Sequence, residues 1–277
     1  MQVVIFCGGL GTRIREETEF RPKPMVKIGE RPILWHIMKV YAHYGFNDFI
    51  LCLGYKDEVI REYFYHYEIL NKDFTIELGD SKNIEIHGNH GEEGWRVTLA
   101  NTGDKVLKGA RLKRIEKYID DDQLMATYGD NVANIDINAL LTFHRSHGKL
   151  ATVTGINPAS QFGELKTKGD KVEAFSEKPK DGHSLVNGGF FVFNRGIFDY
   201  LSDDANCDLE IGVLESVTRD GQLMVYKHKG FWACMDTLRD MEHLNKLWVE
   251  GKAEWKVWDR QLLAQVYSCS HNLPCSK

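Results

Sequence analysis

An apolar strand at the start of the chain, followed at once by a glycine-rich loop, constrains the fold more than any other feature. Residues 2–7 are apolar after the first position, which is typical of a strand covered on both faces. Residues 32–44 then have the apolar spacing of a helix, residues 49–53 that of a second buried strand, and residues 57–67 that of a second helix. Strands and helices in alternation predict a parallel sheet with helices on both faces.

We therefore expect an α/β protein with a Rossmann-like, three-layer, mostly parallel sheet. The alternation breaks between residues 73 and 101, where residues 74–78 and 95–99 alternate in polarity like antiparallel strands. This pattern predicts an antiparallel β arm inserted at about 73–101. The α/β pattern then resumes and ends with a helix over residues 238–249. We predict a single domain over residues 1–258, followed by a C-terminal tail over 259–277.

Charge and composition exclude several classes of protein. The net charge is −5, which disfavours non-specific binding to nucleic acid or to an anionic membrane. No run of about 18 apolar residues is present, and the first residues lack the pattern of a secretory signal. The six cysteines are scattered without a Cys-x-x-Cys pair, as expected for free thiols in a reducing compartment. We expect a cytoplasmic protein with no nucleic-acid or membrane partner.

The first candidate site is the loop that follows the opening strand. In open parallel sheets, ligands bind beyond the carboxyl ends of the strands. The glycines let successive backbone N–H groups point at one anion, and the guanidinium at the end of the loop can hold phosphate oxygens in pairs. Glycines alone are equally consistent with a tight turn. The spacing matches neither the dinucleotide fingerprint nor the P-loop. The loop reads Cys7-Gly8-Gly9-Leu10-Gly11-Thr12-Arg13.

A lysine held between two prolines is the second candidate. Pro22 and Pro24 flank Lys23, so the backbone there is stiff and its ammonium group can be aimed at one point. Two unit charges about 4 Å apart interact by about 4 kcal/mol at an effective dielectric of 20, so a local cationic cluster can outweigh the overall negative charge. The alternative is a solvated charged loop.

Two aspartates far apart in the sequence complete the candidate site. Asp130 follows the strand predicted over residues 124–128, and Asp236 follows an apolar stretch just before the last helix. A Mg²⁺ ion bound to phosphates is usually held by one or two carboxylates, phosphate oxygens and water. If the two aspartates meet beside the glycine loop, they form such a site. Taken alone, each is weak, because Gly-Asp is also common in turns.

Several short segments occur in an order that resembles the sugar-1-phosphate nucleotidyltransferase family, most closely its cytidylyltransferase branch. The resemblance extends from residue 2 to about residue 258. It is carried by the glycine loop over residues 8–13, Arg21-Pro22-Lys23-Pro24-Met25, Thr127-Tyr128-Gly129-Asp130, Glu177-Lys178-Pro179, Asn187-Gly188-Gly189 and Met235-Asp236-Thr237-Leu238-Arg239-Asp240.

The resemblance implies a reaction and a set of roles. CTP and α-D-glucose 1-phosphate would give CDP-glucose and pyrophosphate, with Mg²⁺ as cofactor and a homo-oligomer as the assembly. Arg13, Lys23 and Asp130 would be catalytic, and Asp130 and Asp236 would hold the metal. The nucleotide would be bound by Cys7, Gly8, Gly9, Leu10, Gly11, Thr12, Arg13, Lys23, Arg111 and Asp130. The sugar phosphate would be bound by Glu177, Lys178, Asn187 and Gly188.

The chain departs from the family pattern at three places near the expected sugar site. Asn131 stands where glycine is usual, Asn134 stands where a second aspartate is usual, and Gly212-Val213-Leu214 replaces a Glu-Pro-Leu segment. Two alternatives therefore stay open. One is a thymidylyl- or uridylyltransferase acting on another sugar 1-phosphate, and the other is a nucleotide-binding regulatory protein with impaired turnover.

Overall fold

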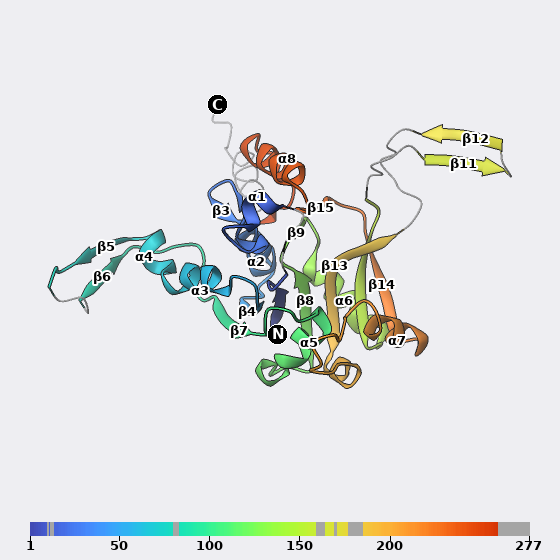
Figure 1. The fold of residues 1–277 in the computed structure, drawn as a ribbon, viewed down its shortest axis with the longest axis horizontal. Helices are drawn as coiled ribbons and strands as arrows, with labels where there is room; N and C mark the ends of the chain where they lie inside the picture. The colour runs from blue at the N-terminus through green and yellow to red at the C-terminus, as the bar shows by residue number, and fades with distance from the viewer. Residues whose placement is uncertain are drawn as a thin grey trace, which may run out of the picture.

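The computed structural model describes residues 1–9, 11, 14–79, 83–158, 164–168, 171–176 and 185–259. Figure 1 shows a central sheet with helices around it and two β hairpins that extend away from it. In spatial order the sheet contains β14 (Leu223–His228), β10 (Ala151–Ile156), β13 (Val186–Asn194), β8 (Gln123–Tyr128), β1 (Val3–Phe6), β4 (Asp48–Leu53) and β7 (Arg96–Asn101).

The described helices are α1 (Arg15–Thr18), α2 (Ile33–His43), α3 (Asp57–Tyr65), α4 (Tyr67–Asn71), α5 (Lys108–Arg114), α6 (Ile137–His147), α7 (Val213–Arg219) and α8 (Leu238–Val249). Four 3-10 turns are also described: η1 (Lys23–Met25), η2 (Glu116–Tyr118), η3 (Arg195–Tyr200) and η4 (Val257–Asp259).

The sheet is mostly parallel, as predicted. β1 pairs in parallel with β4 and β8, β4 with β7, and β10 with β14. Only β13 runs against its two neighbours, β8 and β10. This arrangement confirms the predicted α/β class.

Alternate residues of the central strand face two separate hydrophobic layers. Val3 and Ile5 pack with residues of α2, α6 and α8, whereas Val4 and Phe6 pack with residues of α5 and α7. All four side chains are buried. Because successive side chains of a strand point to opposite faces, a strand buried on both sides is apolar throughout. The three-layer arrangement of the prediction is confirmed.

The inserted arm differs from the prediction in one of its two strands. β5 (Asp73–Ile76) pairs antiparallel with β6 (Ile84–His87), and Figure 1 shows this hairpin projecting away from the sheet. Of residues 95–99, which were expected in the arm, residues 96–99 instead begin β7, which pairs in parallel with β4. That part of the prediction is wrong, because β7 is an edge strand whose partial exposure gives the same alternation of polarity.

Three further short antiparallel pairs lie outside the main sheet: β2 (Lys27–Ile28) with β3 (Arg31–Pro32), β9 (Asn131–Ala133) with β15 (Trp232–Cys234), and β11 (Glu164–Lys168) with β12 (Lys171–Ser176). The pair β9–β15 is the one that matters for the site. Within the described residues, no helix has the length and apolar character needed to cross a membrane.

Candidate active site

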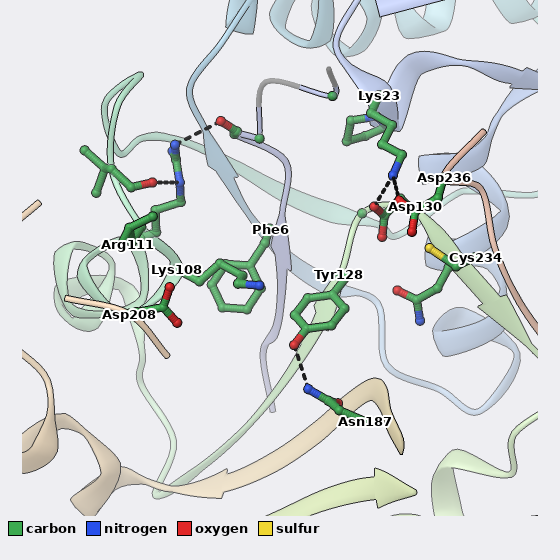
Figure 2. A pocket seen from close by; sticks show the side chains of 18 of the residues that line it. Phe6, Lys23, Lys108, Arg111, Tyr128, Asp130, Asn187, Asp208, Cys234 and Asp236 are labelled. Atoms are coloured by element: carbon green, nitrogen blue, oxygen red, sulfur yellow. Dashed lines mark hydrogen bonds and ion pairs between the residues drawn. The ribbon is translucent and has the colours of Figure 1, made fainter. Parts of the chain in front are cut away.

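A cavity of about 590 Å³ opens at the carboxyl ends of β1 and β8. Phe6 and Tyr128 are register partners, so the two strands end side by side. A cavity of this size is in the usual range for small-molecule sites. Figure 2 shows charged side chains at both of its ends. Eight of the predicted site residues line it: Gly8, Gly9, Gly11, Lys23, Arg111, Asp130, Asn187 and Asp236.

The pairing of β9 with β15 brings the two predicted aspartates together. β9 begins directly after Asp130, and β15 ends two residues before Asp236. Asn131 is paired with Cys234 in this ladder, and the backbone N–H of Met235 donates to the carbonyl of Asp130 at 2.8 Å. The two carboxylates therefore face one another across a two-stranded ribbon.

Lys23 lies between these two carboxylates. Its Nζ is 2.7 Å from Asp130 Oδ2 and 2.5 Å from Asp236 Oδ1, as Figure 2 shows. The lysine starts the η1 turn, and this turn packs closely on the end of β8. A Cβ atom at Gly129 would lie 2.7 Å from the carbonyl oxygen of Phe6 and 2.9 Å from Pro24 Cγ. Only glycine allows that approach.

Burial and neighbouring charges shift the pKa values of Lys23 and Cys234. Burial alone lowers the pKa of Lys23, but the charge and hydrogen bond of Asp130 and the hydrogen bond of Asp236 outweigh burial and leave the pKa above its ordinary value. The adjacent Cys234 thiol has a raised pKa, first because of burial and then because of the charges of Asp130 and Asp236. The site therefore contains an ammonium group and a neutral thiol beside two acidic side chains.

The donor set suits a hard divalent cation. The ligand atoms of Asp130, Cys234 and Asp236 all lie within 4.8 Å of one another. Carboxylate oxygens are the ligands that Mg²⁺ prefers, whereas a protonated thiol is a poor one. The Lys23 ammonium group already places a positive charge that both carboxylates share. The two oxygens are thus arranged to bind a cation jointly.

Arg111 has a structural role that was not predicted from the sequence. The side chain is buried, and a Cβ at Gly8 would lie 2.1 Å from its Nη1. A guanidinium has five N–H donors, and each is used within the protein. Their acceptors are the carbonyls of Val106, Leu53, Gly8 and Asp104 and the hydroxyl of Thr102. Arg111 therefore ties the end of β4 to the loops that follow β1 and β7.

A second charged group at the other end of the cavity was not predicted. Lys108 Nζ lies 2.6 Å from Glu210 Oε1 and 4.5 Å from the centre of the Tyr128 ring. The Tyr128 hydroxyl donates to Glu210 and accepts from Asn187 Nδ2 at 2.8 Å. Asp208 also lines this end. No local signal marks Lys108 or Glu210, because only the packing of α5 against the segment before α7 brings them together.

The remaining predicted residues fall into two groups. Cys7 is buried and its backbone N–H donates to Cys52, so its side chain does not line the cavity. Gly188 lies beside the cavity, and its carbonyl accepts from Asn131 and Trp232. The residues with predicted roles that lie outside the described residues, and whose roles stay predictions, are Leu10, Thr12, Arg13, Glu177 and Lys178.

The fold and the cavity together define an α/β protein with a charged small-molecule site at the carboxyl edge of its sheet. The chain belongs to the family described as Nucleotidyl transferase, which matches residues 2–248. It is 47% identical over 260 residues to a glucose-1-phosphate cytidylyltransferase from Salmonella typhimurium, and the match covers 94% of this chain and 100% of that relative.

Solved structures of low sequence identity share the fold. HddC from Yersinia pseudotuberculosis has a TM-score of 0.62 at 22% identity, covering 89% of this chain and 99% of the other. UDP-glucose pyrophosphorylase complexed with UDP-glucose has a TM-score of 0.63 at 14% identity, covering 90% and 98%. These likenesses support the Rossmann-like architecture.

Proposed function

We propose that this chain is a glucose-1-phosphate cytidylyltransferase, which converts CTP and α-D-glucose 1-phosphate into CDP-glucose and pyrophosphate. The observation that carries the proposal is the position of Lys23 between Asp130 and Asp236, at the edge of a cavity that the glycine loop also lines. The identity of 47% to the Salmonella typhimurium enzyme over nearly the whole chain supports the choice of base and sugar.

The reaction requires positioning and charge neutralisation more than covalent chemistry. An oxygen of the sugar phosphate attacks the α-phosphorus of CTP in line. A new P–O bond forms, the bond to the β-phosphate oxygen breaks, and pyrophosphate leaves. No protein nucleophile is needed, so catalysis rests on orientation and on cations near the phosphate oxygens. We assign Lys23 and Arg13 to those oxygens, with Lys23 leaving its carboxylate partners as the triphosphate binds.

We assign a Mg²⁺ ion to Asp130 and Asp236. Their oxygens already share one positive charge, that of Lys23, so they are arranged for a cation. When bound, the ion would neutralise charge on the phosphate oxygens. The β9–β15 ladder positions Asp130 and Asp236 beside one another.

We assign the sugar phosphate to the side of the cavity that carries Asn187 and Gly188, together with Glu177 and Lys178. Asn187 lines the cavity and donates to Tyr128. Arg111 is assigned to holding the Gly8 carbonyl rather than to direct contact with the nucleotide. We further propose that residues 1–258 form one catalytic domain and that the protein acts in the cytoplasm as a homo-oligomer.

The test is a matrix of nucleoside triphosphates against sugar 1-phosphates, with pyrophosphate release as the readout. CTP with glucose 1-phosphate is expected to give the highest kcat/KM, and the release should require a divalent cation. A higher value with another base or sugar would correct the substrate assignment. Calorimetric binding of CTP without pyrophosphate release from any pair would favour the regulatory alternative.

A further inference from the structure

Asn131 lines the cavity, and one polar atom of its side chain has no hydrogen-bond partner among the described residues. It is the first residue of β9, is fully buried, and lines the cavity next to Asp130. Its Nδ2 donates to the carbonyl of Gly188 at 3.1 Å. Among the residues that the structure describes, its Oδ1 has no hydrogen-bond partner. A buried acceptor without a donor is destabilising, and such atoms in native proteins usually have a role.

The orientation of this amide is fixed by its neighbours. A carbonyl can only accept, so the amino group of Asn131 must face Gly188. The indole Nε1 of Trp232 donates to the same carbonyl at 2.8 Å. Rotating the Asn131 amide would bring two acceptors together and would leave an amino group without a partner. Oδ1 therefore stays an acceptor that the described protein does not satisfy.

Two other polar groups of the cavity wall are already paired within the described part of the chain. Asn187 Oδ1 accepts from the backbone N–H of Gly189 at 2.8 Å, and the Tyr128 hydroxyl donates to Glu210. The spare acceptor calls for a ligand with a hydroxyl or N–H donor. Phosphate oxygens at neutral pH are acceptors, whereas the hydroxyl groups of a sugar 1-phosphate can donate. Asn131 also contacts Gly188, on the strand assigned to the sugar.

We propose that Asn131 Oδ1 accepts a hydrogen bond from one hydroxyl of the sugar 1-phosphate and makes that hydroxyl a requirement for good substrates. The inference rests on the proposed function, because it places the sugar in this cavity. A site built to pair a substrate hydroxyl discriminates strongly against the analogue that lacks it, since a buried polar group is then left unpaired.

The test compares glucose 1-phosphate with its monodeoxy analogues, each lacking one hydroxyl, in the wild type and in Asn131→Ala. In the wild type one analogue is expected to lose about tenfold to a hundredfold in kcat/KM, on the scale of one buried hydrogen bond. That selective loss should disappear in Asn131→Ala, whose kcat/KM with glucose 1-phosphate itself should already be lower. Equal deoxy penalties in the two proteins would overturn the proposal.

One further variant separates recognition from support of the strand. Trp232→Phe removes the other donor to the Gly188 carbonyl but leaves Oδ1 in place, so the selective penalty should persist. Thermal melting checks that each variant is folded.

Calorimetry distinguishes failure of this proposal from failure of the proposed function. If no sugar phosphate supports pyrophosphate release, the proposed function is wrong, and affinities for the same analogues decide the inference. Equal wild-type affinity for glucose 1-phosphate and all its monodeoxy analogues would overturn it. If a deoxyribose form of CTP binds more weakly than CTP, and Asn131→Ala abolishes that difference, then Asn131 Oδ1 accepts from the nucleotide. That result would also overturn the proposal.

Discussion

The ammonium nitrogen of Lys23 lies 2.7 Å from Asp130 Oδ2, although 107 residues separate the two in the sequence. The same nitrogen lies 2.5 Å from Asp236 Oδ1. Two carboxylates this close would repel one another without a cation between them. Lys23 therefore stabilises the close approach of the two carboxylates.

Replacing Lys23 with methionine should lower kcat/KM about a hundredfold to a thousandfold, because a charge-assisted contact to the transition state is worth about 3–4 kcal/mol. The measurement is steady-state pyrophosphate release with CTP and glucose 1-phosphate. Lys23→Arg serves as the control that keeps the positive charge, and it should retain more activity. Wild-type kinetics in the methionine variant would mean that Lys23 only neutralises the two aspartates.

Asp130→Asn and Asp236→Asn should each abolish turnover and weaken binding of Mn²⁺, measured by electron paramagnetic resonance as a probe for the Mg²⁺ site. An amide keeps the size of the side chain but loses the charge that holds the cation. Asp136→Asn is a matched control, because Asp136 caps α6 and asparagine caps helices equally well. Unchanged Mn²⁺ affinity in either site variant would refute the metal assignment.

Arg111→Lys should destabilise the protein by about 2–4 kcal/mol, since a lysine cannot reproduce the five hydrogen bonds of a buried guanidinium. The KM for CTP should also rise, because the Gly8 carbonyl loses its donor. Denaturant unfolding and steady-state kinetics measure the two effects. The same change at Arg145, whose side chain is exposed, should alter neither. A higher KM for CTP with unchanged stability would favour direct contact with the nucleotide.

Stability should fall as the solution is acidified because of His36. Burial lowers the pKa of His36 from 6.5 to about 4, and the neutral ring contacts the carbonyl of Ile28 at 2.9 Å. Below its ordinary pKa the unfolded chain binds a proton that the folded protein excludes. The contribution of neutral His36 to the free energy of unfolding is therefore complete above pH 6.5, and it is lost progressively as the pH falls toward 4.

The expected loss attributable to His36 is about 2 kcal/mol between roughly pH 7.5 and pH 5. Denaturant melts at several pH values should show a shallower decline in His36→Gln than in the wild type. The same substitution at the exposed His66 should leave the decline unchanged. Parallel curves for the wild type and His36→Gln would contradict the prediction.

The β5–β6 arm should mediate self-association. Phe74 and Ile86 are register partners, and their side chains are 41% and 40% exposed. An apolar pair that its own chain leaves in water is typical of an interface. Light scattering is expected to give an oligomer for the wild type and a smaller species for the double variant Phe74→Ser, Ile86→Ser. Thr75→Ala, in the same strand, is the control. A monomeric wild type would contradict the prediction.

Local pattern was enough to predict the elements that have one strong periodicity. The helix over residues 238–249 has the predicted limits, because apolar spacing marks its buried face and the capping residue Thr237 marks its start. The buried strands β1 and β4 were equally clear. The partner strand of β5 could not be predicted, because β6 and the edge strand β7 both have mixed polarity. Neither segment alone encodes which strand it pairs with.

The sequence by itself determined the fold class and the position of the glycine loop at the end of the first strand. It also identified Lys23, Asp130 and Asp236 as charged candidates at strand or turn ends. The tertiary structure alone decided their contact, through the β9–β15 ladder, which joins segments about a hundred residues apart. It also decided that the guanidinium of Arg111 supports the loop and that Oδ1 of Asn131 has no hydrogen-bond partner among the described residues. Such roles depend on which atoms are buried together, and burial is a property of the packed chain rather than of any local run of residues.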